Sequence, residues 1–204
     1  MITWDGTVNN SERNLFVGRA AYKFQHTSSS ASELGVSALR SQVRNDDNGQ
    51  HGSRTALAVH YSGNLGPWGA QLQVARLDTR PKNPGGNDDI VTVGAFDGSF
   101  NAATKGNLYV TEINYQVSQP IWQLEKIKLY ANYSLYDKSK PEFKDSSRII
   151  LGSSFNFMKL YIATELLVGR HDPYIGTDYT HSLAQGASSN RWTKHFYANI
   201  GYYF

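Results

Sequence analysis

One stretch decides the fold of this chain: Trp192-Thr193-Lys194-His195-Phe196-Tyr197-Ala198-Asn199-Ile200-Gly201-Tyr202-Tyr203-Phe204. Apolar side chains recur at every second position, so Phe196 and Ile200 would lie on one face of an extended strand. His195 and Asn199 would lie on the other face. Lys194 interrupts the apolar face only near one end, where a long side chain can reach polar surroundings. The pattern predicts a β-strand with one apolar and one polar face.

The same alternation recurs along most of the chain, and no stretch shows a sustained helical period. Most segments have about ten or more residues, the length that a tilted strand needs to cross a bilayer, whereas strands of soluble sheets usually have about five or six. Residues 32–44 fit two strand registers. The segments are residues 14–25, 32–44, 53–62, 67–78, 107–117, 124–136, 147–157, 159–171 and 192–204. We therefore expect an all-β, antiparallel chain of about nine to ten strands.

The composition of the 204 residues supports this interpretation. With 13 Tyr, 9 Phe and 4 Trp, the chain is rich in side chains that settle where lipid meets water. Its mean hydropathy of -0.48 is polar, which is expected if every second residue of a membrane strand faces a wet lumen. The absence of cysteine excludes disulfides, thiolate metal sites and cysteine nucleophiles.

The connections between these segments alternate in length. Three are short, namely residues 63–66, 118–120 and 156–159. Four are long and rich in Asp, Gly, Lys, Ser and Pro, namely residues 45–52, 79–106, 137–145 and 172–191. Short periplasmic turns that alternate with long extracellular loops are typical of bacterial outer-membrane barrels. The connections therefore predict an antiparallel transmembrane β-barrel.

Two parts of the sequence resemble a known family. The ending Phe196–Phe204 resembles the terminal strand of Gram-negative porins, and residues 54–61 with 66–73 are similar to a hairpin of phosphate-selective-type porins. The resemblance implies a bacterial outer-membrane location, contact with lipid and lipopolysaccharide, and recognition of Phe204 by the barrel-assembly machinery. Porins often form homotrimers, but no residue pattern here decides the oligomeric state.

The strand count predicts that this chain is one part of a larger barrel. If the last strand ends in the periplasm, residues 14–25 descend from outside and Met1–Glu12 lies outside the cell. Bacterial barrels have even strand numbers and begin in the periplasm, and no signal-peptide pattern opens the sequence. We expect residues 1–204 to be a single β-barrel domain or its C-terminal portion, in a barrel of roughly sixteen strands as the resemblance implies. The alternatives are a tenth strand at Ile2–Asp5, or two strands counted as one.

Charged side chains on the predicted polar faces are the candidate pore-lining residues. They are Arg19, Lys23, Arg54, Glu112, Lys126, Lys128, Arg148 and Glu165. The excess of basic groups would lower the barrier for anions and raise it for cations. Lys126 and Lys128 would form a basic ladder, unless they pair with Glu112 and Glu165 across strands. We expect passive diffusion of small hydrophilic solutes, with a mild preference for anions.

The long 79–106 loop is a second candidate site, because it contains the apolar stretch Ile90–Phe96. A loop that folds inward would constrict the pore and bring four charged residues into contact with solute. These residues are Arg80, Lys82, Asp88 and Asp89. We favour a surface hairpin, since loops of this length are as often structural as functional.

Other functions have weaker support in the sequence. His60 and Ser62 form a His-x-Ser pair of the kind that outer-membrane lipid hydrolases use, but it would face the lumen without a supporting acid, so no enzyme is expected. No metal site is expected at His171, Asp172, Asp178 and His181, which are loosely spaced. No cofactor motif is present, and the basic residues are too dispersed for nucleic acid.

Two other architectures remain as alternatives. One is a barrel with a plugged lumen, against which small residues on the predicted inner face, such as Gly152, favour open space. The other is a soluble β-barrel or sandwich, on which the outward aromatic side chains would form exposed apolar patches.

Overall fold

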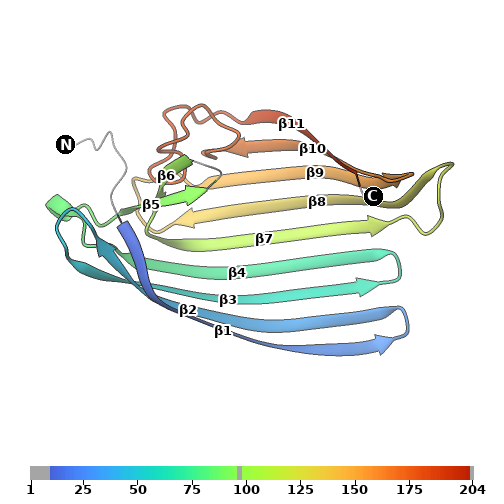
Figure 1. Ribbon diagram of the computed structural model, residues 1–204, viewed down its shortest axis with the longest axis horizontal. Helices are drawn as coiled ribbons and strands as arrows, with labels where there is room; N and C mark the ends of the chain where they lie inside the picture. The colour runs from blue at the N-terminus through green and yellow to red at the C-terminus, as the bar shows by residue number, and fades with distance from the viewer. Residues whose placement is uncertain (1–9, 96–97, 203–204) are drawn as a thin grey trace.

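Eleven strands run through the part of the chain that the computed structural model describes, residues 10–95 and 98–202. The strands are β1 (Asn10–Thr27), β2 (Ser30–Asn45), β3 (His51–Leu65), β4 (Trp68–Arg80), β5 (Ile90–Ala95), β6 (Gly98–Ala103), β7 (Lys105–Gln116), β8 (Leu124–Lys138), β9 (Ser146–Phe157), β10 (Leu160–Arg170) and β11 (Thr193–Tyr202), and a 3-10 turn, η1, spans Pro84–Gly86. Nine strands form one antiparallel sheet in the order β1-β2-β3-β4-β7-β8-β9-β10-β11, and β5 and β6 form a separate hairpin (Figure 1).

Each of the nine predicted strands is present in the large sheet. They range from 10 residues in β11 to 18 residues in β1, and most extend a few residues beyond the predicted bounds. The structure also decides the register of β2, in which Leu34 pairs with Tyr61. Two parts of the prediction, Tyr203–Phe204 and the alternative tenth strand Ile2–Asp5, lie outside the described residues.

Cross-strand register gives the sheet two unlike faces. On one of them, called here the apolar face, Val36, Val59 and Val74 are aligned on adjacent strands and are 53%, 51% and 51% exposed. On the opposite face, called here the polar face, Glu33 is aligned with Ser62. Because side chains alternate along every strand, each further pairing repeats this separation across the sheet.

The connections are sorted by length only in part, because the β7–β8 connection, residues 117–123, is as long as the β8–β9 connection, residues 139–145, and longer than the β2–β3 connection, residues 46–50. Short turns join β1 to β2, β3 to β4 and β9 to β10 at one end of the sheet (Figure 1). The longer segments that follow β2, β4, β8 and β10 lie at the other end. The two ends are called here the short-turn end and the long-loop end.

The sheet formed by the described residues is open. Its edges are β1 and β11, each of which has a single neighbour, so these nine strands do not close into the predicted barrel by themselves. Since neighbours alternate in direction, β1 and β11 both run from the long-loop end to the short-turn end. A direct β1–β11 pair would therefore be parallel.

The long connections fold together into a cap, defined here as the described parts of residues 81–104, 139–145 and 171–192. The backbone amides of Asn101 and Ala103 in β6 donate to the carbonyls of Thr180 (2.8 Å) and Leu183 (3.1 Å). The last loop thereby adds an irregular third segment to the hairpin. Inside the cap, Ile90 packs with Ala184 and Phe143, although the sheet itself has no second layer to bury its apolar face.

Cationic side chains hold the last loop to the sheet. The ammonium group of Lys138 donates to the carbonyls of Lys144 (2.7 Å) and Ser182 (3.0 Å). The guanidinium of Arg148 makes two hydrogen bonds with the Asp172 carboxylate, of 2.6 and 2.8 Å. The Lys138 bonds satisfy carbonyl groups that an irregular loop would otherwise leave unpaired, and the Arg148 bonds hold the start of the loop to β9.

His171 closes the same loop and is only 3% exposed. Its Nδ1 accepts a hydrogen bond from the backbone amide of Ala187 (3.0 Å), so Nε2 carries the proton and donates to Asn190 Oδ1 (2.8 Å). Burial lowers the pKa of His171, and this effect outweighs the opposing hydrogen bond to Asn190. The imidazole is therefore neutral in the folded cap.

Acidification should loosen the cap through His171. Because its pKa is lowered on folding, the stability that the neutral ring contributes is present above about pH 6.5 and is lost as the pH falls. Protonation at Nδ1 also removes the acceptor for the Ala187 amide. We expect that amide, corrected for its intrinsic rate, to exchange faster with solvent at about pH 5 than at about pH 7.5.

His171→Gln should abolish this pH dependence, whereas His181→Gln in the same loop should preserve it. Hydrogen exchange followed by NMR or mass spectrometry measures the effect. A pH dependence that persists unchanged in His171→Gln would contradict the assignment.

Candidate functional site

Charged side chains from three adjacent strands meet on the polar face, toward its short-turn end. Glu33 of β2 forms an ion pair with Arg19 of β1, and its carboxylate lies 3.1 Å from Nε2 of His60 on β3. Lys23 Nζ lies 3.8 Å from the other carboxylate oxygen. A Cβ on Gly35 would come within 2.3 Å of the His60 ring, so glycine makes room for the imidazole. Two permanently charged cations thus share one carboxylate here, which leaves a local surplus of positive charge.

A second polar group joins β7, β8 and β10. Lys128 Nζ donates to the Glu112 carboxylate at 3.1 Å, and Tyr130 donates its hydroxyl hydrogen to Glu165. The Tyr130 ring lies over Gly152, where an added Cβ would come within 2.2 Å of it. The gap that the sequence predicts at Gly152 is therefore filled by an aromatic ring.

The predicted ladder of Lys126 and Lys128 is interrupted by the backbone. The pairing of β8 with β9 shifts register between Glu125 and Lys128, and Lys126 has a φ of 52°. An irregularity of this kind breaks the alternation on which the ladder depends. Lys128 pairs with Glu112, which is the alternative that the sequence left open, and Lys126 lies beside the β9–β10 turn at Met158.

Arg54 and Arg148 lie nearer to the long-loop end and are also paired. Arg54 Nη1 lies 3.3 Å from the Glu12 carboxylate, and Arg148 binds Asp172. The structure therefore gives five of the basic candidates a carboxylate partner: Arg19, Lys23, Arg54, Lys128 and Arg148. Most of the predicted excess charge is balanced locally.

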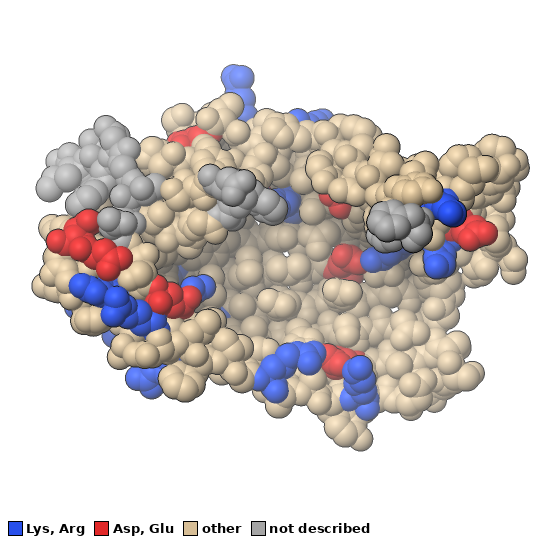
Figure 2. All heavy atoms as spheres, viewed as in Figure 1, with Lys and Arg blue, Asp and Glu red and all other residues tan. Residues whose placement is uncertain are grey.

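The two charged groups border a polar hollow. A cavity of about 520 Å³ has Lys23 and Glu33 on one side, Asn114 and Lys128 on the other, and Gln71 between them. Figure 2 looks onto this hollowed face, where charged side chains of both signs lie in small groups among uncharged ones. Such a surface can exchange hydrogen bonds with a hydrated solute as the solute passes.

The 79–106 loop does not form the surface hairpin that the sequence analysis favours. Tyr136, on the polar face of β8, donates its hydroxyl hydrogen to the Ala103 carbonyl (2.7 Å), and the Thr79 amide donates to the Thr104 carbonyl (2.8 Å). The hairpin therefore packs against the polar face at the long-loop end. These hydrogen bonds are the physical reason that it lies there, and its apolar side chains face the sheet across a shared cavity.

Two of the four charged candidates of this loop, Asp88 and Asp89, hold the cap together through their side chains. Arg80 Nε lies 3.4 Å from Asp78, and Asp89 forms an ion pair with Lys140. The Asp88 carboxylate accepts a hydrogen bond from the Asn83 amide (2.7 Å), and the Lys82 carbonyl accepts one from Asn48 (2.9 Å). Asp88 and Asp89 thus have structural partners, whereas the side chains of Arg80 and Lys82 are exposed.

The sequence analysis does not include three acidic residues of these clusters among the candidate pore-lining residues. Glu33 lies in residues 32–44, which fit two registers. If Leu34 is assigned to the apolar face, its neighbour Glu33 falls on the polar face, so the choice of that register would have identified it. Glu12 lies before the first predicted strand, and Asp172 lies in a loop. Only the folded chain brings Glu12 to Arg54 and Asp172 to Arg148.

The histidines of the two chemical alternatives have other partners than the sequence analysis considered. His60 Nε2 contacts Glu33 and Arg19 rather than Ser62. His181 pairs with Asp178 at 3.0 Å, apart from the contacts of His171. Among residues 10–95 and 98–202, no group of three or more His, Cys, Asp or Glu side chains is placed to hold a metal ion.

Comparison with known proteins identifies no relative: no family model, curated protein or solved structure matches the chain. Within the described ranges, no helix has the length and apolar character needed to cross a membrane. The fold that is shown is an open, almost entirely antiparallel β-sheet whose polar face is capped at one end.

Proposed function

We propose that this chain forms part of the wall of a bacterial outer-membrane β-barrel of the porin class, with its polar face lining a water-filled path for small hydrophilic solutes. The observation that carries the proposal is the division of nine long strands into an apolar and a polar face. On the apolar face, Leu57, Leu72 and Leu151 are 62%, 51% and 50% exposed. Contact with lipid would remove this large apolar surface from water.

The apolar face has a height that suits a membrane. On β4 it extends from Trp68 to Arg76, about 26 Å along the strand at roughly 3.3 Å per residue. With the tilt of about 35–45° that barrel strands have, this length spans about 20 Å along the membrane normal, slightly less than the apolar band of about 25 Å in outer-membrane barrels. Toward the long-loop end, Arg40, Arg76 and Lys194 share this face, where they would meet phosphate groups of lipid or lipopolysaccharide. Toward the short-turn end, the rings of Trp68 and Tyr115 pack 4.8 Å apart, as aromatic side chains do at membrane interfaces.

The proposal requires additional strands at the two open edges of the sheet, β1 and β11. Hydrocarbon leaves no water to satisfy the free backbone groups of β1 and β11, so both edges must pair with further strands in a membrane. Because β1 and β11 run in the same direction, fully antiparallel closure needs an odd number of added strands. The total is then even, as in bacterial barrels, and a barrel of roughly sixteen strands would need about seven more.

The charge pattern supports a weak preference for anions. Most basic side chains of the polar face neutralise a carboxylate, so the wall as a whole carries little excess charge. Arg19 and Lys23 are the exception, because they share Glu33. This local surplus would lower the barrier for anions that pass the short-turn half of the wall.

A plugged outer-membrane barrel is the second candidate function. It is favoured by the cap, which packs on the polar face at the long-loop end, and by the Tyr130 ring over Gly152. In such a barrel the charged pairs would stabilise the fold, and no current would pass. Conductance separates the two candidates.

Membrane burial can be tested with one spin label on each face. Leu72→Cys and Gln73→Cys place labels on opposite faces of β4, and no native cysteine has to be removed. In outer-membrane vesicles of a Gram-negative host, we expect oxygen to reach the label at 72 more readily than the label at 73. A water-soluble nickel complex should reach the label at 73 more readily than the label at 72. Power-saturation EPR measures both accessibilities.

Tyr133→Cys and Ser134→Cys on β8 should repeat this contrast. High accessibility to the nickel complex at positions 72 and 133, equal to that at 73 and 134, would show that the apolar face is not in lipid.

Ion selectivity should depend on Glu33. Glu33→Gln removes the one carboxylate that residues 10–95 and 98–202 place in an ion pair with Arg19 and Lys23, so the anion-to-cation permeability ratio should rise roughly twofold. The reversal potential under a salt gradient measures this ratio, after vesicles from a host without its own major porins are fused to a planar bilayer. Glu142→Gln, an exposed carboxylate of the β8–β9 loop, is the matched control.

An equal ratio in Glu33→Gln and the unmodified protein would remove Glu33 from the conduction path. The absence of discrete current steps in the unmodified protein would contradict an open path formed by this chain alone, and it is the result expected of a plugged barrel or of a sheet that stays open.

A further inference from the structure

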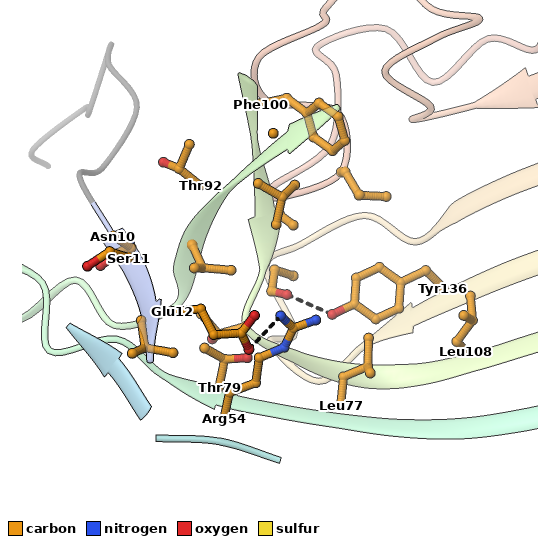
Figure 3. A pocket seen from close by; sticks show the side chains of 18 residues that line it. Asn10, Ser11, Glu12, Arg54, Leu77, Thr79, Thr92, Phe100, Leu108 and Tyr136 are labelled. Carbon is orange, nitrogen blue, oxygen red and sulfur yellow. Dashed lines mark hydrogen bonds and ion pairs between the residues drawn. The ribbon is translucent and has the colours of Figure 1, made fainter. Parts of the chain in front are cut away.

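A cavity of about 520 Å³ lies between the β5–β6 hairpin and the polar face, at the long-loop end of the sheet. Figure 3 shows that Leu77 and Leu108 enter it from the sheet, and that Thr92 and Phe100 enter it from the hairpin. The cavity thus has walls from two separate parts of the fold. Ligand-binding pockets of proteins have volumes of about 300–1,000 Å³.

The walls of this cavity are mostly apolar, unlike the hollow near the short-turn end. Val91 and Val93 of β5 and Ala102 of β6 face Val43 of β2 across it. No lysine or histidine is among its described lining residues. A hydrophilic solute would lose hydrogen bonds to water here without replacing them, so the cavity suits an apolar molecule.

Polar groups converge at one end of the cavity. Glu12 accepts hydrogen bonds from Arg54 Nη1 (3.3 Å) and from the Ser41 hydroxyl, and both end on the same carboxylate oxygen, Oε1. Figure 3 shows the Arg54–Glu12 contact at the sheet side of the cavity. The second carboxylate oxygen can accept a further hydrogen bond, and the guanidinium has further N–H groups to donate.

We infer that this cavity binds a neutral, mainly apolar molecule that carries a hydroxyl group, such as an aromatic alcohol. The apolar walls bury the hydrocarbon part, while the hydroxyl donates to Glu12 and accepts from Arg54. A charged ligand is disfavoured, because Arg54 and Glu12 already neutralise each other and an added ion would compete with one of them. This inference concerns the cavity alone and does not require the membrane location.

The probe is 1-naphthol, with naphthalene and 1-naphthoate as comparisons. The full chain is kept in detergent, and equilibrium dialysis against protein-free micelles at the same detergent concentration corrects for partition into micelles. We expect saturable binding of about one naphthol per chain, with naphthalene and naphthoate each bound about tenfold more weakly.

Ala102→Phe fills the cavity and should reduce naphthol affinity at least about tenfold. Ala131→Phe makes the same change on the apolar face, beside Ile113 and Leu151, and should leave the affinity unchanged. Glu12→Gln keeps the size of the side chain but leaves Arg54 without its counterion. This variant should therefore come to prefer 1-naphthoate over 1-naphthol.

Circular dichroism establishes that each variant keeps its β-structure. Should Ala102→Phe fail to fold, the reversal of ligand preference in Glu12→Gln tests the site by itself. Equal naphthol binding by the Ala102→Phe and Ala131→Phe variants would overturn the inference, because the probe would then only partition onto apolar surface. Equal binding of naphthalene and naphthol would overturn the role of the polar end.

Discussion

The rest of the structure depends on the hydrogen-bonded register of nine antiparallel strands. A shift of one residue in any strand would move its whole apolar set to the polar face. Because the register holds, Arg19, Glu33 and His60 meet although they come from three strands. The apolar side chains also line up across neighbouring strands for the same reason, and this continuous apolar area is the main support for the proposed membrane location.

The cap is stabilised by different interactions from the sheet. The sheet has no second layer, so the strands are held by backbone hydrogen bonds and by side-chain pairs across strands. The cap has a small apolar core around Ile90 and Ala184, and charged groups such as Lys138 donate to its loop carbonyls. It covers one end of the polar face and encloses an apolar cavity there, so a single face presents both a hydrophilic hollow and an apolar cavity.

The sequence analysis succeeds where structure follows from neighbouring residues. Alternation with a period of two is a local property, so all nine strands of the large sheet could be predicted. The lengths of the connections were predicted less well, because the β7–β8 connection, residues 117–123, is longer than expected. The sequence analysis falls short where a local irregularity of the backbone interrupts the alternation of side chains between the two faces. Lys126 is such a place, because its φ is positive and the pairing of β8 with β9 shifts register beside it. It also falls short at Glu33, because residues 32–44 fit two registers when read alone.

By itself, the sequence determined an all-β antiparallel chain with one apolar and one polar face, because every strand records its two faces in its own residues. Only the tertiary structure decided that Lys128 pairs with Glu112 and that the hairpin packs against the polar face. It also decided that the described strands form an open sheet. Partners of this kind are distant in sequence. They meet because of strand register, loop packing and the burial of the hairpin, and none of these can be predicted from a single segment.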